Sequence, residues 1–298
     1  MASLKEIKSK ISGVKKTKQI TRAMNMVAAS KLRGAQGAMD AFRPYAEKFA
    51  EVLGNIADKT TDETSPLLIP KDEVNNVHVV MLTSDRGLCG GFNSNLMDKT
   101  EEIVEDFQRR GVNVSLTAFG KKGRDWARKE KLTIADQYLD VVGGKFGFNV
   151  ASSFGQKAIE GFLFGDYDEV HIVYSEFRSM ANQIPVVKQL LPIVAIEKPE
   201  ETETAAEDSR YLPEHICEPS ADALLNTMLP KSIYIQIYHA LLETSTSEHA
   251  ARMRAMDNAT KACDDMIESL TLTYNKARQQ SITMELMDIV GGAEALRG

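Results

Sequence analysis

The sequence predicts an α/β protein in which the N- and C-terminal helices form a long antiparallel coiled coil and a small central α/β domain holds a parallel sheet. Apolar residues recur at helical spacing near both ends, and short apolar runs alternate with amphipathic segments in the middle. Of the 298 residues, 43% are hydrophobic and 26% charged, which excludes the disordered and fibrous classes. No apolar run reaches the roughly 18 residues that a membrane-spanning helix needs.

We predict four regions along the chain. They are an N-terminal coiled-coil helix (1–57), the central α/β domain (74–197), an acidic connecting loop (198–220) and a C-terminal coiled-coil helix (221–298). Two connections, 58–73 and 197–219, are rich in Pro, Thr and acidic residues, which is typical of segments that join compact elements.

The N-terminal region carries apolar or small residues that alternate three and four positions apart. The most regular part consists of Leu32, Ala35, Met39, Phe42, Ala46, Phe49, Leu53 and Ile56. Because this alternation is typical of a coiled-coil seam, we predict a helix over 3–56. We expect Pro44 to kink or interrupt that helix, since proline lacks the backbone donor and its ring crowds the preceding turn.

Between residues 17 and 28 we expect the seam to change phase. The apolar residues there are Ile20, Met24 and Val27. The strict repeat would instead place the polar residues Lys18, Thr21 and Asn25 inside. We therefore predict that the apolar set continues the seam.

The C-terminal region mirrors the first. Its seam consists of Met253, Met256, Thr260, Cys263, Ile267, Leu270, Tyr274 and Ala277. The stretch 231–290 contains neither Pro nor Gly, so we predict an unbroken helix there. Two long seams each need a partner, and antiparallel pairing of the two helices satisfies both. The longer C-terminal helix should then overhang its partner with the apolar stretch 281–293, and such an overhang usually marks an interface.

The middle of the chain has the pattern of a small Rossmann-like α/β domain. Predicted strands are Val77–Thr83, Val112–Phe119 and Val170–Tyr174, predicted helices are Asn95–Arg110 and Val150–Phe164, and weaker extended segments are Leu132–Leu139 and Ile184–Ile196. Strands that alternate with helices indicate a small parallel α/β sheet.

The glycine-rich loop Asp85–Asn93 is the most enzyme-like feature, because glycines between a strand and a helix can cradle phosphate. Its GLCGG core is neither GxGxxG nor GxxxxGK[ST], so we favour a structural tight turn. Cys89 within it has no evident histidine base, which favours a packing role over a nucleophile. The five histidines never fall at HxxxH or HxH spacing, and three widely spaced cysteines form no CxxC pair. We expect no metal, no disulfide framework and no cofactor.

The charges are unevenly distributed. Residues 1–33 hold nine basic side chains and one acidic, while residues 197–218 hold eight acidic and two basic. The basic start surrounds Met24 and Met26, so it is either a solvated basic face or an interaction helix for acidic protein, nucleic acid or anionic lipid. Aromatic residues for base stacking are absent from it, which disfavours nucleic acid.

Three long blocks closely resemble the gamma subunit of F-type ATP synthase. They are ISGVKKTKQITRAMNMVAASKLRGAQ (11–36), TSDRGLCGGFNSNL (83–96) and YNKARQQSITMELMDIVGGA (274–293). Their order and spacing match the family, and the resemblance covers essentially the whole chain. In that family the terminal helices form a rotor shaft and the α/β domain forms its foot.

The resemblance implies a central-stalk rotor subunit of the proton-translocating synthase, present in one copy per complex. The shaft would stand inside the hexamer of alpha and beta subunits, and the foot would bind the epsilon subunit and sit on the membrane c-ring. The chain would hold no nucleotide site, cofactor or nucleic acid and would itself catalyse nothing. It would be a peripheral protein on the cytoplasmic face of a bacterial inner membrane. The coupling ion is left open.

The resemblance also implies which residues contact partners. Arg278 and Gln279 match the polar residues that meet loops of the beta subunit, and Thr283 belongs to the same block. Met24 lies in the basic block that faces an acidic region of beta. The stretch 282–296, including Leu286 and Ile289, would form a tip inside an apolar sleeve of the hexamer. Asp288 stands where the family usually has Glu. Residues 197–218 contain only Cys217, so a regulatory cysteine pair is not expected.

Two other classes remain as alternatives. An α/β enzyme that uses the GLCGG loop would leave both long helices unexplained, and titration with nucleotides or small phosphates would detect it. A coiled-coil nucleic-acid binder would fit the basic start but not the net charge of −6, and a gel shift at low salt would detect it.

Overall fold

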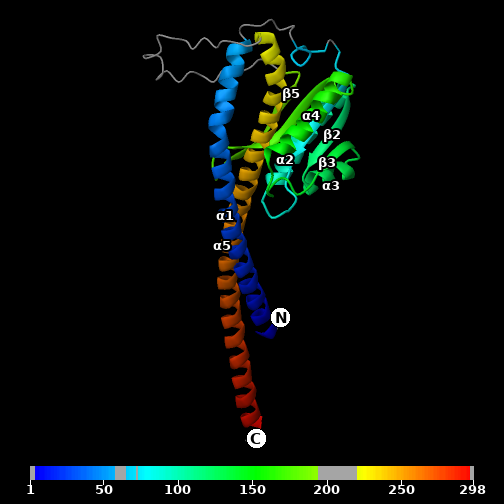
Figure 1. Ribbon diagram of the computed structural model, residues 1–298. Coiled ribbons are helices and arrows are strands. Elements are labelled where there is room, and N and C mark those ends of the chain that lie inside the picture. The colour runs from blue at the N-terminus through cyan, green and yellow to red at the C-terminus, as the bar shows by residue number, and fades with distance from the viewer. Residues whose placement is uncertain (1–3, 58–64, 72, 194–219, 296–298) are drawn as a thin grey trace. The chain divides into compact units, whose positions relative to one another are not determined.

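The computed structural model describes residues 4–57, 65–71, 73–193 and 220–295 (Figure 1). The chain divides into two compact units, one comprising residues 30–251 and the other comprising residues up to 29 together with those from 252 onward. The acidic loop and Cys217 lie outside the described residues, and the region boundaries predicted above stay a prediction. No helix in the described ranges is long and apolar enough to cross a membrane.

The larger unit contains one five-stranded sheet. Its strands are β1 (Asn76–Leu82), β2 (Asn113–Phe119), β3 (Thr133–Tyr138), β4 (Glu169–Phe177) and β5 (Gln183–Leu191), in the order β3-β2-β1-β4-β5. Strands β1 to β4 are parallel, which confirms the predicted α/β class. Strand β5, which the sequence predicts only as a weaker extended segment, is antiparallel to β4. Only residues 178–182 join the two strands, and a parallel crossover needs a dozen or more residues.

Helices cover both faces of this sheet. They are α2 (Phe92–Arg109), α3 (Lys121–Lys129) and α4 (Phe148–Phe164). Helices α2 and α3 pack on one face, where Phe92 and Leu96 meet Val77 and Val79. On the other face α4 and the first part of the last helix share the main core. The backbones approach closely at Gly155, where an added Cβ would lie 2.4 Å from the ring of Tyr234.

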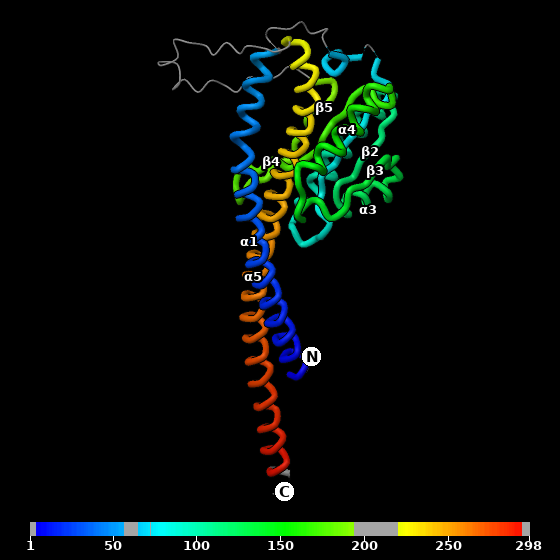
Figure 2. The backbone as a smooth tube through the Cα atoms, viewed as in Figure 1, coloured from blue at the N-terminus to red at the C-terminus, as the bar shows by residue number. Residues whose placement is uncertain are grey.

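The two long helices are α1 (Leu4–Ala57) and α5 (Ala221–Ala295). Ser220 caps α5, since its hydroxyl accepts a hydrogen bond from the Ala223 amide at 3.2 Å. This cap places the start of the helix at Ala221, and Pro230 lies inside the helix. Pro44 likewise lies inside α1, so the predicted interruption is wrong. Figure 2 shows α5 as one continuous coil.

Contacts within each unit establish antiparallel pairing of α1 and α5. In the larger unit Phe42 packs edge-on against Tyr238, with ring centroids 4.8 Å apart. In the smaller unit the Asn25 side-chain amide donates to the Met253 carbonyl at 2.8 Å, and Lys18 forms an ion pair with Asp264. Residue numbers fall on one helix as they rise on the other, which confirms the coiled coil predicted from the two seams.

The predicted change of phase between residues 17 and 28 is wrong. Thr21 is buried, and Lys18 and Asn25 are partly buried, so the strict repeat continues. Ile20 and Val27 are instead 61% and 58% exposed. Polar residues fit this seam because the opposite helix supplies hydrogen-bond partners, so no polar group is buried unsatisfied there.

Candidate functional site

The C-terminal part of α5 carries an exposed apolar surface. The seam on this helix continues, half-buried, through Ile267, Leu270, Tyr274, Ala277 and Ser281, and residues 282–293 are all exposed. We call the large apolar side chains beyond the seam the apolar tip: Ile282, Met284, Leu286, Met287, Ile289 and Val290. Leu286 is 58% and Ile289 71% exposed. Both predicted tip residues therefore lie free on the helix surface.

The apolar tip is not a stripe along one side of α5. At about 100° per residue its six side chains spread over about 220° of the helix circumference. A helix that packs on a single surface needs an apolar stripe of roughly 100°. The distribution fits a partner that surrounds the helix, and it does not fit a single neighbouring helix.

Polar residues precede the apolar tip by one turn. Arg278 and Gln279 are both exposed. Neither side chain has a hydrogen bond or ion pair within the described part of the chain, so the guanidinium and the amide can bind another molecule. Thr283 is exposed, and its hydroxyl donates to the Gln279 carbonyl at 2.9 Å, one turn back on the helix. The structure thus places these three predicted residues next to one another on α5.

A second exposed apolar surface lies on α1. Ile20, Met24 and Val27 share one helix face because they are spaced four and three residues apart, and the exposed Lys16 precedes them on that face. Met24, the predicted contact residue, is half-buried, whereas Ile20 and Val27 are exposed. Sequence reasoning assigned both of these neighbours to the seam and so missed them as surface residues. Their exposure follows from the polar residues that occupy the seam.

The glycine-rich loop is held by its own contacts. The Asn93 side-chain oxygen accepts from the Ser84 amide at 3.0 Å, and its nitrogen lies 3.2 Å from the Cys89 sulfur. Cys89 itself is buried. The backbone at Leu88 has φ 64° and at Gly90 φ 60°, so the loop turns sharply through the left-handed region. These contacts favour the structural tight turn over a phosphate cradle.

The next helix N-terminus beside this loop is also occupied by protein groups. The Asp85 carboxylate accepts a hydrogen bond from the Lys121 amide at 3.0 Å, where an anion would otherwise bind the start of α3. Gly120 (φ 94°) packs so tightly that an added Cβ would lie 2.1 Å from the Thr83 carbonyl oxygen. Among the described residues, no three His, Cys, Asp or Glu side chains are grouped to hold a metal ion.

Comparisons with known proteins identify the family. A family model described as ATP synthase matches residues 3–296. The ATP synthase gamma chain of Desulfosudis oleivorans is 64% identical over 299 residues, with all of both chains covered. That of Desulforapulum autotrophicum is 62% identical and covers 99% of this chain and 100% of its own. The chain belongs to the ATP synthase gamma chain family.

Solved structures agree at the level of the fold. A chain from the Euglena gracilis mitochondrial ATP synthase, solved as OSCP/F1/c-ring, superposes with a TM-score of 0.68 at 21% identity. It covers 98% of this chain and 94% of its own length. A chain from the central stalk and c-ring of the Tetrahymena thermophila enzyme gives a TM-score of 0.57 at 23% identity, covering 80% and 99%. Both chains therefore share the fold of this chain.

Among the buried titratable groups in the larger unit of this gamma chain, His78 and Glu243 have shifted pKa values and lie away from the surfaces described above. Burial lowers the pKa of His78 to about 4, with a smaller opposing effect from Asp136. Burial, helped by the charge of Glu176, raises the pKa of Glu243 to about 7. Neither group belongs to the residues predicted to contact partners.

Proposed function

We propose that this gamma chain is the central-stalk rotor subunit of a bacterial, proton-translocating F-type ATP synthase. In this role it couples rotation of the membrane c-ring to conformational change at catalytic sites on the beta subunits. The observation that carries the proposal is the apolar tip, which exposes large side chains around more than half of a helix. Exposed apolar surface of this extent marks a protein interface.

The shape of the apolar tip determines what kind of partner fits it. A ring of subunits with an apolar bore would cover all six side chains at once. Burial of apolar area contributes about 25 cal/mol per Å2 without directional demands, so such a contact holds the helix while it turns. The alpha and beta subunits of the catalytic hexamer are the proposed ring.

The mechanism follows from asymmetry. Helices α1 and α5 present different side chains around their common seam, so three chemically identical beta subunits each meet a different face. Each beta subunit is then held in a different conformation, and its nucleotide affinity changes as the face before it changes. The basic block that contains Met24, with the exposed Lys16 on the same face of α1, would meet an acidic region of beta, and Arg278 with Gln279 would bind a polar loop of beta.

The chain acts in this proposal without a catalytic site of its own. Polar groups of the glycine-rich loop form hydrogen bonds within the loop, and the Asp85 carboxylate occupies the N-terminus of α3 next to it. The foot would bind the epsilon subunit and sit on the c-ring, with one copy of the chain in each complex. The complex would place it on the cytoplasmic face of the inner membrane.

The test is to substitute the polar residues before the apolar tip in the assembled complex. A hydrogen bond to a charged group contributes about 1.5 to 3 kcal/mol, so Arg278→Ala should change the relative energy of one rotor angle. We expect longer or redistributed dwell times in single-molecule rotation and lower steady-state turnover. Nucleotide affinity of isolated beta should be unchanged.

Lys276→Ala is the matched control, because Lys276 is also exposed on α5 but lies about 200° around the helix from Arg278. It should leave dwell times unchanged. Copurification of alpha, beta and epsilon with each variant verifies assembly. Normal dwells and turnover for both Arg278→Ala and Gln279→Ala in a complete complex would contradict the proposed contact. Failure of the unmodified chain to copurify with alpha and beta would contradict the function itself.

A further inference from the structure

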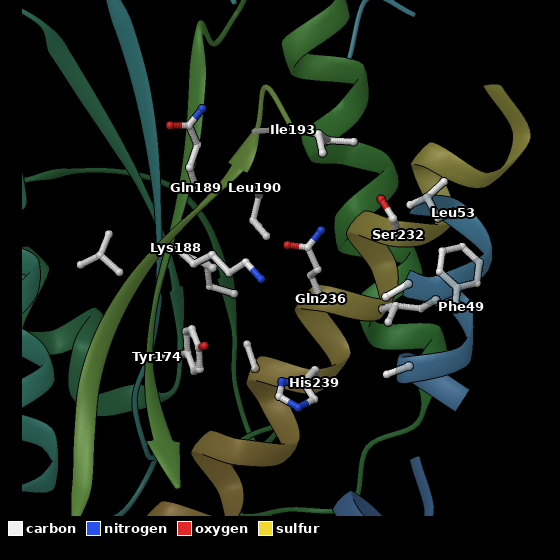
Figure 3. A pocket seen from close by; sticks show the side chains of 16 residues that line it. Phe49, Leu53, Tyr174, Lys188, Gln189, Leu190, Ile193, Ser232, Gln236 and His239 are labelled. Carbon is white, nitrogen blue, oxygen red and sulfur yellow. The ribbon is translucent and has the colours of Figure 1, made fainter. Parts of the chain in front are cut away.

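A cavity of about 570 Å3 lies within the larger unit, between the sheet and the two long helices (Figure 3). Strands β4 and β5 line one side, and α1 and α5 line the other. Its volume falls within the roughly 300–1,000 Å3 of small-molecule sites, and it is partly open to solvent. The rotor function proposed above makes no use of this cavity.

The cavity has a polar part and an apolar part. Figure 3 shows Lys188 extending from β5 toward Gln236 on α5, with His239 one turn along the same helix. Phe49, Leu53 and Ile193 line another, mainly apolar region, in which Ser232 lies beside Leu53. A ligand that fills both parts must carry a polar head and an apolar body.

The charges of the lining residues indicate that the polar head of the ligand is negatively charged. None of the described residues that line the cavity is acidic, and Lys188 carries the one fixed charge. Lys188 is exposed, and within the described part of the chain it has neither an ion pair nor a hydrogen bond. Its ammonium can therefore accept an anionic partner without breaking an existing contact.

The neighbouring groups fit one negative charge. Burial, with the nearby charges of Lys188 and Arg43 and against the smaller effect of Glu176, lowers the pKa of His239, so its imidazole is neutral and able to donate one hydrogen bond. Glu243 lies near the polar part, with an oxygen 3.7 Å from the His239 ring, but it does not line the cavity. One ammonium with neutral donors suits a carboxylate, whereas a phosphate usually binds several cations or a helix start.

We propose that this cavity binds an amphipathic monocarboxylate, with its carboxylate at Lys188 and Gln236 and its hydrocarbon chain against Phe49, Leu53 and Ile193. The two parts of the site recognise the two parts of the ligand. The occupant would join α1 and α5 to the β4–β5 edge of the sheet, all within one unit of the chain.

The test uses dodecanoate that carries a photoreactive diazirine on its last carbon, irradiated with the full chain below micelle-forming concentrations. We expect saturable labelling, mapped by mass spectrometry to peptides that contain residues 46–53 or Ile193. Unlabelled dodecanoate should compete, and dodecyltrimethylammonium, which has the same tail and the opposite charge, should compete at least about tenfold less well.

Two variants and one control decide the site. Lys188→Glu should weaken labelling at least about tenfold, since a charged hydrogen bond is lost and a repulsion gained. Ala50→Phe should also weaken it by filling the apolar part. Lys129→Glu is the control, because it reverses an 82% exposed lysine on α3, which contacts the opposite side of the sheet. Circular dichroism verifies that each variant is folded.

Three results would overturn the proposal. Labelling that both variants leave unchanged would show that the cavity is not the site. Labelling confined to the apolar tip would show non-specific adsorption. Loss with Ala50→Phe but not with Lys188→Glu would show an apolar ligand without carboxylate recognition.

Discussion

The hydroxyl oxygen of Thr21 on α1 lies 2.8 Å from that of Thr260 on α5, inside the coiled-coil seam. Each hydroxyl also lies within reach of a backbone carbonyl on its own helix, of Lys18 at 3.0 Å and of Met256 at 2.7 Å. The pair can therefore satisfy both hydroxyls while they are shielded from water. This contact lets the three-four repeat continue through the most polar part of the basic N-terminal block.

Substitution of both threonines should cost less stability than the two single substitutions added together. Thr21→Val removes the cross-helix partner of the Thr260 hydroxyl in a half-buried seam. This loss should lower the free energy of unfolding by about 1 kcal/mol. The double variant Thr21→Val/Thr260→Val should lose less than the sum of the two single variants. Urea unfolding followed by circular dichroism, with hydrogen exchange of residues 253–267 as a local measure, gives the comparison. Thr17→Val is the control, because Thr17 is exposed and bonds only within its own helix. A loss of stability in the double variant equal to the sum of the losses in the two single variants would show that the hydroxyls do not interact.

The pairing of the two helices predicts a specific cross-link. Extension of the observed contacts toward the N-terminus brings Leu4 opposite Ala277, so cysteines at these positions should form a disulfide on mild oxidation. The native Cys89, Cys217 and Cys263 are first replaced, and the product is read as a mobility change on a non-reducing gel. A Leu4→Cys/Ile233→Cys pair should stay reduced. The opposite outcome for the two pairs would make the antiparallel register wrong.

The stability of the larger unit should depend on pH through His78. Its ring lies 2.8 Å from the Ser115 hydroxyl and 2.9 Å from the Thr117 hydroxyl, and it stacks on Tyr167. The folded pKa of about 4 lies below the ordinary value of 6.5, so the unfolded chain binds a proton more readily between these values. The stability is complete above pH 6.5 and falls as the pH decreases toward 4, by at most about 3 kcal/mol.

Free energies of unfolding of the wild type and His78→Gln between pH 4 and 7 test this expectation. The variant keeps an amide that can bond both hydroxyls and does not titrate. Its stability should change less over this range than that of the wild type. Identical pH profiles would show that His78 is not the group responsible.

Glu243 should make the stability of the fold decrease as the pH rises, which is opposite to the effect of His78. One of its carboxylate oxygens is buried without a hydrogen bond from the described residues, and its folded pKa is raised to about 7. The folded chain therefore binds the extra proton between pH 4.5 and 7, and this contribution is lost as the pH rises through 7. Glu243→Gln should raise the melting temperature at pH 8 and have little effect at pH 5. Glu268→Gln, at an exposed position of α5, is the control that should shift neither. A destabilised Glu243→Gln at pH 8 would show that the charged form is the one the fold prefers.

Cys89 should be dispensable for ATP turnover by the assembled complex. The thiol is buried, and its sulfur lies 3.2 Å from the side-chain nitrogen of Asn93, so it packs inside the turn. Cys89→Ala should leave turnover within a few-fold of the wild type, because the smaller side chain fits the same turn. A loss of several orders of magnitude in a complex that assembles normally would revive the enzyme hypothesis.

Much of the fold could be predicted from periodicity, because burial and spacing agree along both seams and in strands β1, β2 and β4. Helix α3 was not predicted, since its sequence is mainly charged and only Gly123 and Ala127 are buried. A helix that buries two small residues leaves no hydrophobic period to detect. The direction of β5 depends on the short connection 178–182, which becomes evident only once both strand ends are known.

The exposed surface at the end of α5 could be predicted from the sequence, because exposure follows where the seam ends at Ser281. The surface on α1 could not, since Ile20 and Val27 look like seam residues until the partners of Thr21 and Asn25 are known. Hydrophobicity alone ranks isoleucine above threonine at a buried position. The hydrogen bonds that reverse this order come from residues more than two hundred positions away. The cavity at Lys188 depends on four separate elements and has no local sequence signal.

The spread of the apolar tip around α5 has a consequence for friction. The energy of a contact made of dispersion and apolar burial depends little on the rotation of the helix about its axis. Rotation of the apolar tip would therefore exchange one apolar surface for another with little change in energy. Arg278 and Gln279, one turn away, carry directional donors that are sensitive to angle. In a ring-shaped partner the end of the helix would then rotate with low energy barriers, because its contacts are apolar. The polar residues one turn before it would favour particular angles. The energy barriers between rotary positions would be set by these few polar atoms.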